Sequence, residues 1–338
     1  MDKQIIFTEK NRAELLTVEN PPLRDCDIKV KTCFSTISCG TEKANITGSP
    51  DTTPFHPRSN NVSFPRSSGY SASGVVIEKG ACVKSFEIGD KVALYGSKHK
   101  KYNIVNEDNT VKINDGVSME EAALVHIATF PLAAMRKARL EIGESAMVMG
   151  LGILGLMGVG ILRAAGAVPV IAVDPIEERR KKALLFGADY ALNPFDDDFT
   201  EKVKEITGGG VNVAIEVTGI GAGLNQTLDC MKKFGRVALL GCTRDSDFTV
   251  DYYRKVHGPG ISLIGAHTMA RPDSESSPGF FTVTDDMKAV LNLCANGRLD
   301  LKSIIDKTYS PTECEDVYNK LIYDKSFPTV VQFDWSEV

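Results

Sequence analysis

The chain has 338 residues, of which 43% are hydrophobic and 25% charged, a composition typical of globular proteins. This length allows two domains with substantial cores. The formal net charge is −5 and the longest basic run is residues 98–101, so the sequence gives no indication of a nucleic-acid or membrane partner.

The N-terminal residues contain no apolar stretch of signal-peptide length, and no run approaches the roughly 20 apolar residues of a membrane helix. We therefore expect a cytoplasmic protein. The eight cysteines include no C-x-x-C pair and are spread through apparent core segments. We expect most of them to be buried, reduced thiols.

Residues 1–115 have the pattern of a β-rich domain of barrel type. Apolar residues alternate or cluster between turn residues, which predicts strands at residues 4–8, 13–18, 27–35, 72–79, 91–94 and 101–105. The stretch 48–68 contains four prolines and no periodic pattern. It is either a functional lid or substrate wall, or a surface insertion.

Helical patterns begin at residue 119, and residues 146–155 then predict a dinucleotide site. A short apolar run ends in the turn Gly150-x-Gly152-x-x-Gly155, and apolar residues at helical spacing follow. The first glycine permits a tight turn, the second lets the backbone approach a pyrophosphate, and the third lets the helix lie close to the strand. The free N–H groups at the start of the helix, near Ile153 and Leu154, are expected to bind the pyrophosphate.

A second apolar run, residues 168–173, ends in Asp174. We expect this carboxylate to accept hydrogen bonds from the ribose hydroxyls and to repel a 2′-phosphate, which favours NAD(H) over NADP(H). The nearby Arg179 and Arg180 weaken this preference. Arg179 either lies over the adenine ribose or is a solvated helix charge. The alternative for the whole unit is a structural strand–helix–strand turn without a ligand.

Strands and helices alternate from residue 146 to residue 265, which predicts a doubly wound parallel sheet. Ligands of such sheets bind at the carboxyl ends of the strands. Three predicted strands end near Thr218, Gly241 and Gly265, and we expect them to border the cofactor cleft, unless they are ordinary strand-ending turns. A helix near residues 285–296 and a β-like segment at 329–333 follow, and we expect this tail to return to the β-rich domain.

Five segments resemble the medium-chain dehydrogenase/reductase superfamily, which includes the zinc-type alcohol and polyol dehydrogenases: Cys39-Gly-Thr-Glu42, Gly69-Tyr-Ser-x-x-Gly74, Phe86-x-Ile-Gly-Asp90, Glu120-Glu-Ala-Ala-Leu124 and Gly150-Leu-Gly-Ile-Leu-Gly155. The resemblance covers the whole chain. It implies an α/β protein with a GroES-like β-rich catalytic domain at residues 1–127, completed by 268–338, and a Rossmann domain with a doubly wound parallel sheet at 128–267. Segment 95–102 resembles the corresponding segment of short members of the superfamily, and segments 40–42 and 69–71 resemble the branch that includes the bacteriochlorophyllide hydroxyethyl dehydrogenases.

In zinc-dependent members of this superfamily, the catalytic zinc ligands stand at positions that are Cys39, Tyr70 and His126 in this chain. A tyrosine is a poor zinc ligand at neutral pH because its phenol titrates at about pH 10. The resemblance therefore leaves open a zinc site at Cys39, Glu42 and His126, or a zinc-free site in which Cys39 is a buried thiol and His126 is hydrogen-bonded. No cysteine lies between residues 90 and 119, so no structural zinc is expected.

The resemblance implies an NAD(H)-dependent oxidoreductase that interconverts a secondary alcohol or polyol and its ketone, with Cys39, Thr41, Tyr70 and His126 as catalytic residues. Thr41 matches the residue that relays the hydroxyl proton in the family. Without zinc, Tyr70, His126 or Lys43 must stabilise the alkoxide. Ala44 occupies the place of the usual relay histidine, so Lys43 or His56 is expected to replace it.

Two other functions fit the same sequence. One is a zinc-independent reductase of quinones or enones, and the other is a non-catalytic sensor that binds NAD(H). For any of them we expect a homodimer, because residues 236–241 and 261–265 are apolar strands at the end of the predicted sheet, where an exposed edge can pair with a second copy.

Overall fold

The computed structural model describes residues 2–49, 62–243, 246 and 248–338. His56, a candidate for the proton relay, lies outside the described residues. The chain forms two compact units. One holds the described residues up to Ile127 together with Ile305–Val338, and the other holds Ala128–Ile304. No helix in the described part of the chain is long and apolar enough to cross a membrane.

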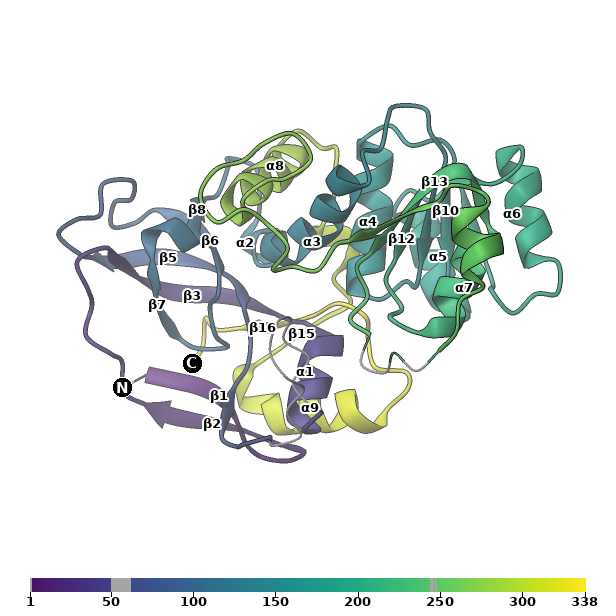
Figure 1. Cartoon of the computed structure of the whole chain (residues 1–338). Coiled ribbons are helices and arrows are strands. Elements are labelled where there is room, and N and C mark those ends of the chain that lie inside the picture. The colour runs from purple at the N-terminus through teal and green to yellow at the C-terminus, as the bar shows by residue number, and fades with distance from the viewer. Residues whose placement is uncertain (1, 50–61, 244–245, 247) are drawn as a thin grey trace. The chain divides into compact units, whose positions relative to one another are not determined.

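The first unit is β-rich, as Figure 1 shows. Among the described residues, one sheet has the order β2-β1-β4 and the other the order β15-β16-β3-β5-β6-β8, with β7 paired to β3. Its strands are β1 (Asp2–Glu9), β2 (Arg12–Val18), β3 (Asp27–Ile37), β4 (Arg66–Ser67), β5 (Ser71–Lys79), β6 (Lys91–Tyr95), β7 (Tyr102–Asn106), β8 (Thr110–Lys112), β15 (Lys307–Tyr309) and β16 (Val331–Asp334). Its helices are α1 (Cys39–Ile46), α2 (Met119–Ala122) and α9 (Cys314–Tyr323), with single turns at Glu107–Asn109 and Pro311–Glu313.

The core of this unit joins the two ends of the chain. Trp335, Tyr318 and Phe333, from the C-terminal segment, are fully buried together with Ile5 and Phe7 of β1. The rings of Phe7 and Tyr318 meet edge to face with 4.9 Å between centroids. The C-terminal strand β16 pairs with β3, so the tail does complete the β-rich unit.

The second unit contains a parallel sheet of order β11-β10-β9-β12-β13-β14 within the described residues. Its strands are β9 (Ala146–Met149), β10 (Val170–Val173), β11 (Tyr190–Leu192), β12 (Val211–Glu216), β13 (Met231–Leu239) and β14 (Ser262–Gly265). The helices are α3 (Val125–Lys137, which begins in the first unit), α4 (Ile153–Ala164), α5 (Glu177–Leu185), α6 (Phe199–Thr207), α7 (Gly221–Asp229) and α8 (Val283–Ala295), with short turns at Tyr253–His257 and Lys302–Ile304. The order of the strands is that of a doubly wound dinucleotide-binding sheet.

The structure differs from the expected boundary at residue 268, because residues 268–304 pack within the second unit. The buried Asp286 of α8 pairs with Arg271 at 2.9 Å and with Arg136 of α3 at 3.3 Å. Leu299 packs on α4 so closely that a Cβ added at Gly160 would lie 2.7 Å from it. A helix following a Pro/Ser-rich stretch gives no indication in the sequence of which core will receive it.

The expectation that most cysteines are buried is wrong. All eight lie within the described residues and none of them forms a disulfide, but only Cys230 and Cys314 are buried. Cys26, Cys82 and Cys242 are exposed. None of these three lies within a strand: Cys26 and Cys82 are in turns, and Cys242 is in the irregular segment after β13.

Candidate active site

The glycine turn of the second unit has the geometry that its spacing predicts. Gly150 adopts φ +99°, a conformation that favours glycine. A Cβ added at Gly155 would lie 1.8 Å from the carbonyl oxygen of Gly150, so only glycine fits where α4 meets the turn. A Cβ at Gly152 would meet no described atom within 4 Å. The N-terminus of α4, with Ile153 and Leu154 in its first turn, therefore faces open space that a pyrophosphate can enter.

Asp174 follows β10 and is 3% exposed. Its carboxylate accepts hydrogen bonds from the Leu151 N–H at 2.8 Å and the Ile176 N–H at 2.9 Å, which ties it to the glycine turn. The Arg179 guanidinium lies 3.5 Å from the same carboxylate. Arg180 instead donates to the backbone carbonyls of Asp174 and Pro175, each at 2.8 Å. Of the two arginines, Arg179 is the one beside the predicted ribose-binding group.

The strand ends near Thr218 and Gly241 are held by a side chain that the sequence analysis missed. Glu216, the last residue of β12, is 3% exposed and accepts hydrogen bonds from the Thr218 N–H at 2.8 Å and the Gly219 N–H at 3.2 Å, and from the Thr218 hydroxyl. Burial raises the pKa of Glu216, while these hydrogen bonds lower it. A Cβ at Gly241 would lie 2.3 Å from the Gly219 nitrogen, so the two strand ends are in close backbone contact.

Gly265, at the end of β14, is also held by a residue that was missed. The ammonium group of Lys137 lies 3.4 Å from the Gly265 carbonyl and also donates to the Ala270 carbonyl. Burial and the nearby Arg271 lower the pKa of Lys137. No pattern in the sequence connects the end of α3 with residues 265–270, because Lys137 and Gly265 stand 128 residues apart in the chain.

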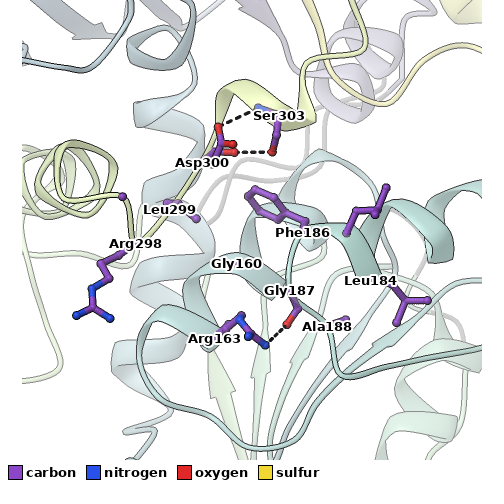
Figure 2. A pocket seen from close by; sticks show the side chains of 12 residues that line it. Gly160, Arg163, Leu184, Phe186, Gly187, Ala188, Arg298, Leu299, Asp300 and Ser303 are labelled. Atoms are coloured by element: carbon purple, nitrogen blue, oxygen red, sulfur yellow. Dashed lines mark hydrogen bonds between the residues drawn. The ribbon is translucent and has the colours of Figure 1, made fainter.

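A cavity of about 440 Å³ in the same unit is not the cofactor site. Figure 2 shows it between Gly160, Arg163, Phe186 and Leu299. These residues lie in the C-terminal half of α4, just after α5, and in the segment that follows α8, whereas the predicted cofactor groups lie at the N-terminus of α4 and just before α5. Arg163 is already engaged with the Gly187 carbonyl at 3.3 Å.

In the first unit, the predicted catalytic residues come together around the phenol of Tyr70. Its hydroxyl hydrogen-bonds with the side chains of Ser38 and Thr41, which stand just before and within the first turn of α1. Removal from solvent and the neighbouring Glu42 carboxylate raise the pKa of Tyr70 above its usual range. The phenol is therefore a proton donor at neutral pH.

His126 lies beside this phenol in a sandwich of aromatic rings. The Tyr70 ring meets it edge to face at 5.6 Å between centroids, and the Tyr95 ring stacks on it at 5.3 Å. Cys39, at the start of α1, directs its thiol toward the Thr329 carbonyl at 3.7 Å. Tyr95 and Ser38 were not predicted, although Tyr95 belongs to the segment 95–102 that the sequence analysis singled out.

Glu42 belongs to a buried polar network. Its carboxylate accepts from the Ser38 N–H at 2.9 Å and from the Tyr318 hydroxyl, and it lies 3.1 Å from His99 Nε2. His99 is 0% exposed and its Nδ1 lies 2.7 Å from the Ser35 hydroxyl, which accepts from Trp335 Nε1 at 2.8 Å. Every group in this chain of contacts has a partner when the His99 Nε2–H donates to the Glu42 carboxylate and Ser35 donates to Nδ1.

These contacts decide whether the predicted ligands fit a zinc ion. Catalytic zinc requires three protein ligands that face one position, and the Glu42 oxygens are directed to His99, Tyr318 and Ser38. Across residues 2–49, 62–243 and 248–338, no group of three or more His, Cys, Asp or Glu side chains is placed to hold a metal ion. Cys39, Glu42 and His126 as arranged do not form the predicted zinc site.

Residues 154–281 match the family model of zinc-binding dehydrogenases. The chain is similar to (R,R)-butanediol dehydrogenase of Bacillus subtilis, with 27% identity over 91% of this chain and 93% of that protein. It is also similar to D-guloside 3-dehydrogenase of Shigella flexneri, with 26% identity over 95% of this chain and 96% of that protein.

Solved structures show the same fold over the whole length. The 2R,3R-butanediol dehydrogenase from Bacillus subtilis superposes with a TM-score of 0.81 and 25% identity, covering 99% of both chains. A zinc-binding dehydrogenase from Sinorhizobium meliloti bound to NADP has a TM-score of 0.81 and 20% identity, again over 99% of both chains.

Proposed function

The chain belongs to the zinc-binding dehydrogenases of the medium-chain dehydrogenase/reductase superfamily, and from this premise we infer an oxidoreductase that interconverts a secondary alcohol or polyol and its ketone with a nicotinamide cofactor. The observation that carries the inference is the glycine turn joined to Asp174 by the Leu151 N–H. The butanediol and guloside dehydrogenases to which the chain is similar act on carbons that bear a hydroxyl group, which supports a small polyhydroxy substrate.

NAD(H) is the proposed cofactor. In this proposal the free N–H groups of the first turn of α4, at Ile153 and Leu154, bind the pyrophosphate. The Asp174 carboxylate binds the ribose hydroxyls. The Arg179 guanidinium lies 3.5 Å from the Asp174 carboxylate. A 2′-phosphate of NADP would therefore compete with this carboxylate for the positive charge of Arg179. At the ends of β12 and β13, Gly241 lets the backbone come close to Gly219, and at the end of β14 Gly265 faces open space that a flat ring can enter.

When bound, the nicotinamide supplies the hydride. The proposed role of Tyr70 is to donate a hydrogen bond to the substrate oxygen, because its phenol stays protonated at neutral pH. As hydride reached the ketone carbon, the substrate oxygen would take the proton of this phenol, and the Thr41 hydroxyl beside Tyr70 would relay one proton from solvent to the phenolate. His126 holds the Tyr70 ring by edge-to-face contact.

The test is to measure nicotinamide absorbance with the purified chain, NADH or NADPH, and a panel of hydroxyketones, ketosugars and unsubstituted ketones. Turnover of a hydroxyketone with NADH, and oxidation of the matching diol with NAD, is the expected result. The metal content of the same preparation is measured alongside. Failure of the whole panel with both cofactors contradicts the proposal.

A zinc-independent quinone or enone reductase is the second candidate, since the described residues do not assemble the predicted zinc ligands. Such a reductase transfers hydride to a conjugated carbon. Reduction of a quinone or enone without any alcohol oxidation distinguishes it. Binding of NADH without turnover of any substrate in the panel points to the sensor function.

We also propose that the protein is a cytoplasmic homodimer. The free thiol state of all eight cysteines is compatible with a reducing compartment. The edge strand β14 leaves backbone groups available on one side, and Leu263 is 42% exposed there. Such an edge can pair with that of a second copy.

A further inference from the structure

Two of the exposed cysteines lie at the same end of one strand pair in the first unit. Cys26 stands just before β3, and Cys82 stands three residues after the end of β5. The strands β3 and β5 are antiparallel and Ile28 lies opposite Lys79. If this register continues beyond the strands, it brings the residues around Cys26 next to those around Cys82.

Hydrogen bonds show that the ladder does continue into both turns. The Gly80 N–H donates to the Asp27 carbonyl at 2.9 Å, and the Cys82 N–H donates to the Asp25 carbonyl at 2.9 Å. A Cβ added at Gly80 would lie 2.3 Å from the carbonyl oxygens of both Arg24 and Asp25, so the two backbones are in close contact. Such neighbouring antiparallel positions lie within the Cα separation that a disulfide can span.

The side chains also meet. The thiol of Cys82 is close enough to that of Cys26 to be the largest cause of its raised pKa, and both residues are open to solvent. This contact, together with the carboxylates of Glu107 and Asp25, raises the pKa of Cys26. Thiolate is therefore scarce at neutral pH, which slows the reaction with an external oxidant but does not prevent ring closure once one sulfur is activated.

We propose that Cys26 and Cys82 are a redox-reactive pair that closes to a reversible disulfide on exposure to a small-molecule disulfide. The thiolate of one cysteine attacks oxidised glutathione, forming a mixed disulfide and releasing one glutathione thiol. The second cysteine then attacks the protein sulfur of that mixed disulfide and releases the other glutathione. The two protein thiols lose two electrons and two protons, and one glutathione disulfide is reduced to two thiols.

The bond would clamp the strand pair at the end remote from the predicted catalytic residues. Along β3 and β5, residues Ser35 and Ala72 pair at the other end, next to α1 and Tyr70. Closure links two positions separated by more than fifty residues of chain, and loops of that length gain stability from a cross-link. The expected consequence is a more stable first unit with little change in turnover.

The experiment exposes the reduced, full-length protein to oxidised glutathione, blocks the remaining thiols by alkylation, and maps the cysteines by peptide mass. The expected product has a disulfide between Cys26 and Cys82 of the same chain, a melting temperature raised by roughly 5 °C or more, and reversal by dithiothreitol. In Cys26→Ser, Cys82 is expected to stop at the glutathione adduct without any rise in melting temperature. Cys242→Ser removes the third exposed thiol and is expected to close as the unchanged chain does.

Three outcomes overturn the proposal. The first is that Cys26 and Cys82 are both recovered in alkylated form. The second is that each cysteine keeps its own glutathione adduct. The third is that the disulfide joins cysteines of two different chains. None of these results bears on the dehydrogenase function, since the pair lies outside the residues assigned to cofactor and substrate.

Discussion

Tyr70 differs most in chemistry from the residue that the superfamily uses at its place, and the structure gives it a consistent environment. Its hydroxyl meets Ser38 and Thr41, and its ring meets His126. The sequence identified Thr41, Tyr70 and His126 because they stand in recognisable motifs. It did not identify Ser38, which looks like any other polar residue, or Tyr95, because its place in the segment 95–102 gives no indication that its ring stacks on His126.

We expect Thr41→Ala, Tyr70→Phe and His126→Ala each to lower kcat by a factor on the order of 10² or more, as loss of a proton-transfer or orienting group does. NADH affinity should stay nearly unchanged, because the cofactor groups belong to the other unit. Steady-state kinetics and NADH fluorescence titration measure the two effects. A lower melting temperature with normal turnover of the folded protein would show that these residues are structural.

The raised pKa of Tyr70 also predicts a pH dependence. Because the pKa of Tyr70 is raised in the folded protein, the phenol keeps its proton through neutral and mildly alkaline pH. The proton is lost only above the pH range in which a tyrosine ordinarily titrates. We expect ketone reduction to retain the contribution of Tyr70 up to about pH 10. The ratio of the Tyr70→Phe rate to the unchanged rate, measured across pH, should be flat below that point, and a change near neutrality contradicts the assignment.

The Glu42 network explains why the predicted zinc ligands do not assemble, and it predicts strong coupling. Removing His99 takes away one of the hydrogen bonds to the buried Glu42 carboxylate, and a hydrogen bond to a charged group contributes about 1.5–3 kcal/mol. We expect His99→Ala to destabilise by about that amount, and Glu42→Gln with His99→Ala to cost clearly less than the sum of the single changes. Urea unfolding measures all three variants, and additive costs would show that the pair is not coupled.

Tyr318 could not be found from the sequence at all. It reaches Glu42 from α9, and the two residues stand far apart in the chain. Nothing in the amphipathic pattern of that helix distinguishes a tyrosine that packs from one that also donates a hydrogen bond.

At Asp174, the structure refines the cofactor prediction by separating two adjacent arginines. Arg179 approaches the carboxylate and Arg180 binds backbone carbonyls. We expect Asp174→Ser to raise KM for NAD and to narrow its advantage in kcat/KM over NADP, while Arg179→Ala should widen that advantage. Arg180→Ala is the matched control and should leave the ratio unchanged. Preference of the unchanged enzyme for NADP is the result that contradicts the reading of Asp174.

At the scale of elements, the glycine turn shows which of its positions serve the fold and which serve the ligand. Gly155 has no room for a methyl group against the Gly150 carbonyl, whereas Gly152 faces open space. We expect Gly155→Ala to destabilise the second unit by several kcal/mol through overpacking, whereas Gly152→Ala should fold normally and weaken NADH binding. Thermal unfolding and NADH titration separate the two. Equal loss of stability in both variants contradicts this division.

Elements with a strong period were predictable, and those without one were not. The alternation of apolar runs and helical patterns predicted the strands β9 to β14 along the chain, most clearly at β9, β10 and β12, which are almost wholly buried and read as nearly continuous apolar sequence. The placement of α8 was missed. Its amphipathic face can pack on any core, and only the buried Asp286 paired with Arg136 and Arg271 fixes it in the second unit.

At the scale of the whole molecule, the two-unit organisation follows from the change in hydrophobic period near residue 119, but the return point of the chain does not. Residues 296–304 carry no break in composition, and the division falls after Ile304. The single turn Lys302–Ile304 ends the second unit, and β15 begins the return to the first.

The association state is the last property to test, and β14 is the element that decides it. β14 is paired on one side only, with β13 in parallel register from Arg236 opposite Ser262 to Leu239 opposite Gly265. Leu263 is 42% exposed on this edge strand. An exposed apolar edge pairs readily with another edge, and a lysine there opposes pairing because both copies bring the same charge to the two-fold contact.

We expect the unchanged chain to be a dimer at micromolar concentration by light scattering, and we expect Leu263→Lys to be a monomer. The control is Leu185→Lys, at a residue of α5 that is 90% exposed, and it is expected to stay dimeric. A dimer that persists in Leu263→Lys would show that the copies meet through another surface, and a monomer in the unchanged chain would show that the edge of β14 stays unpaired.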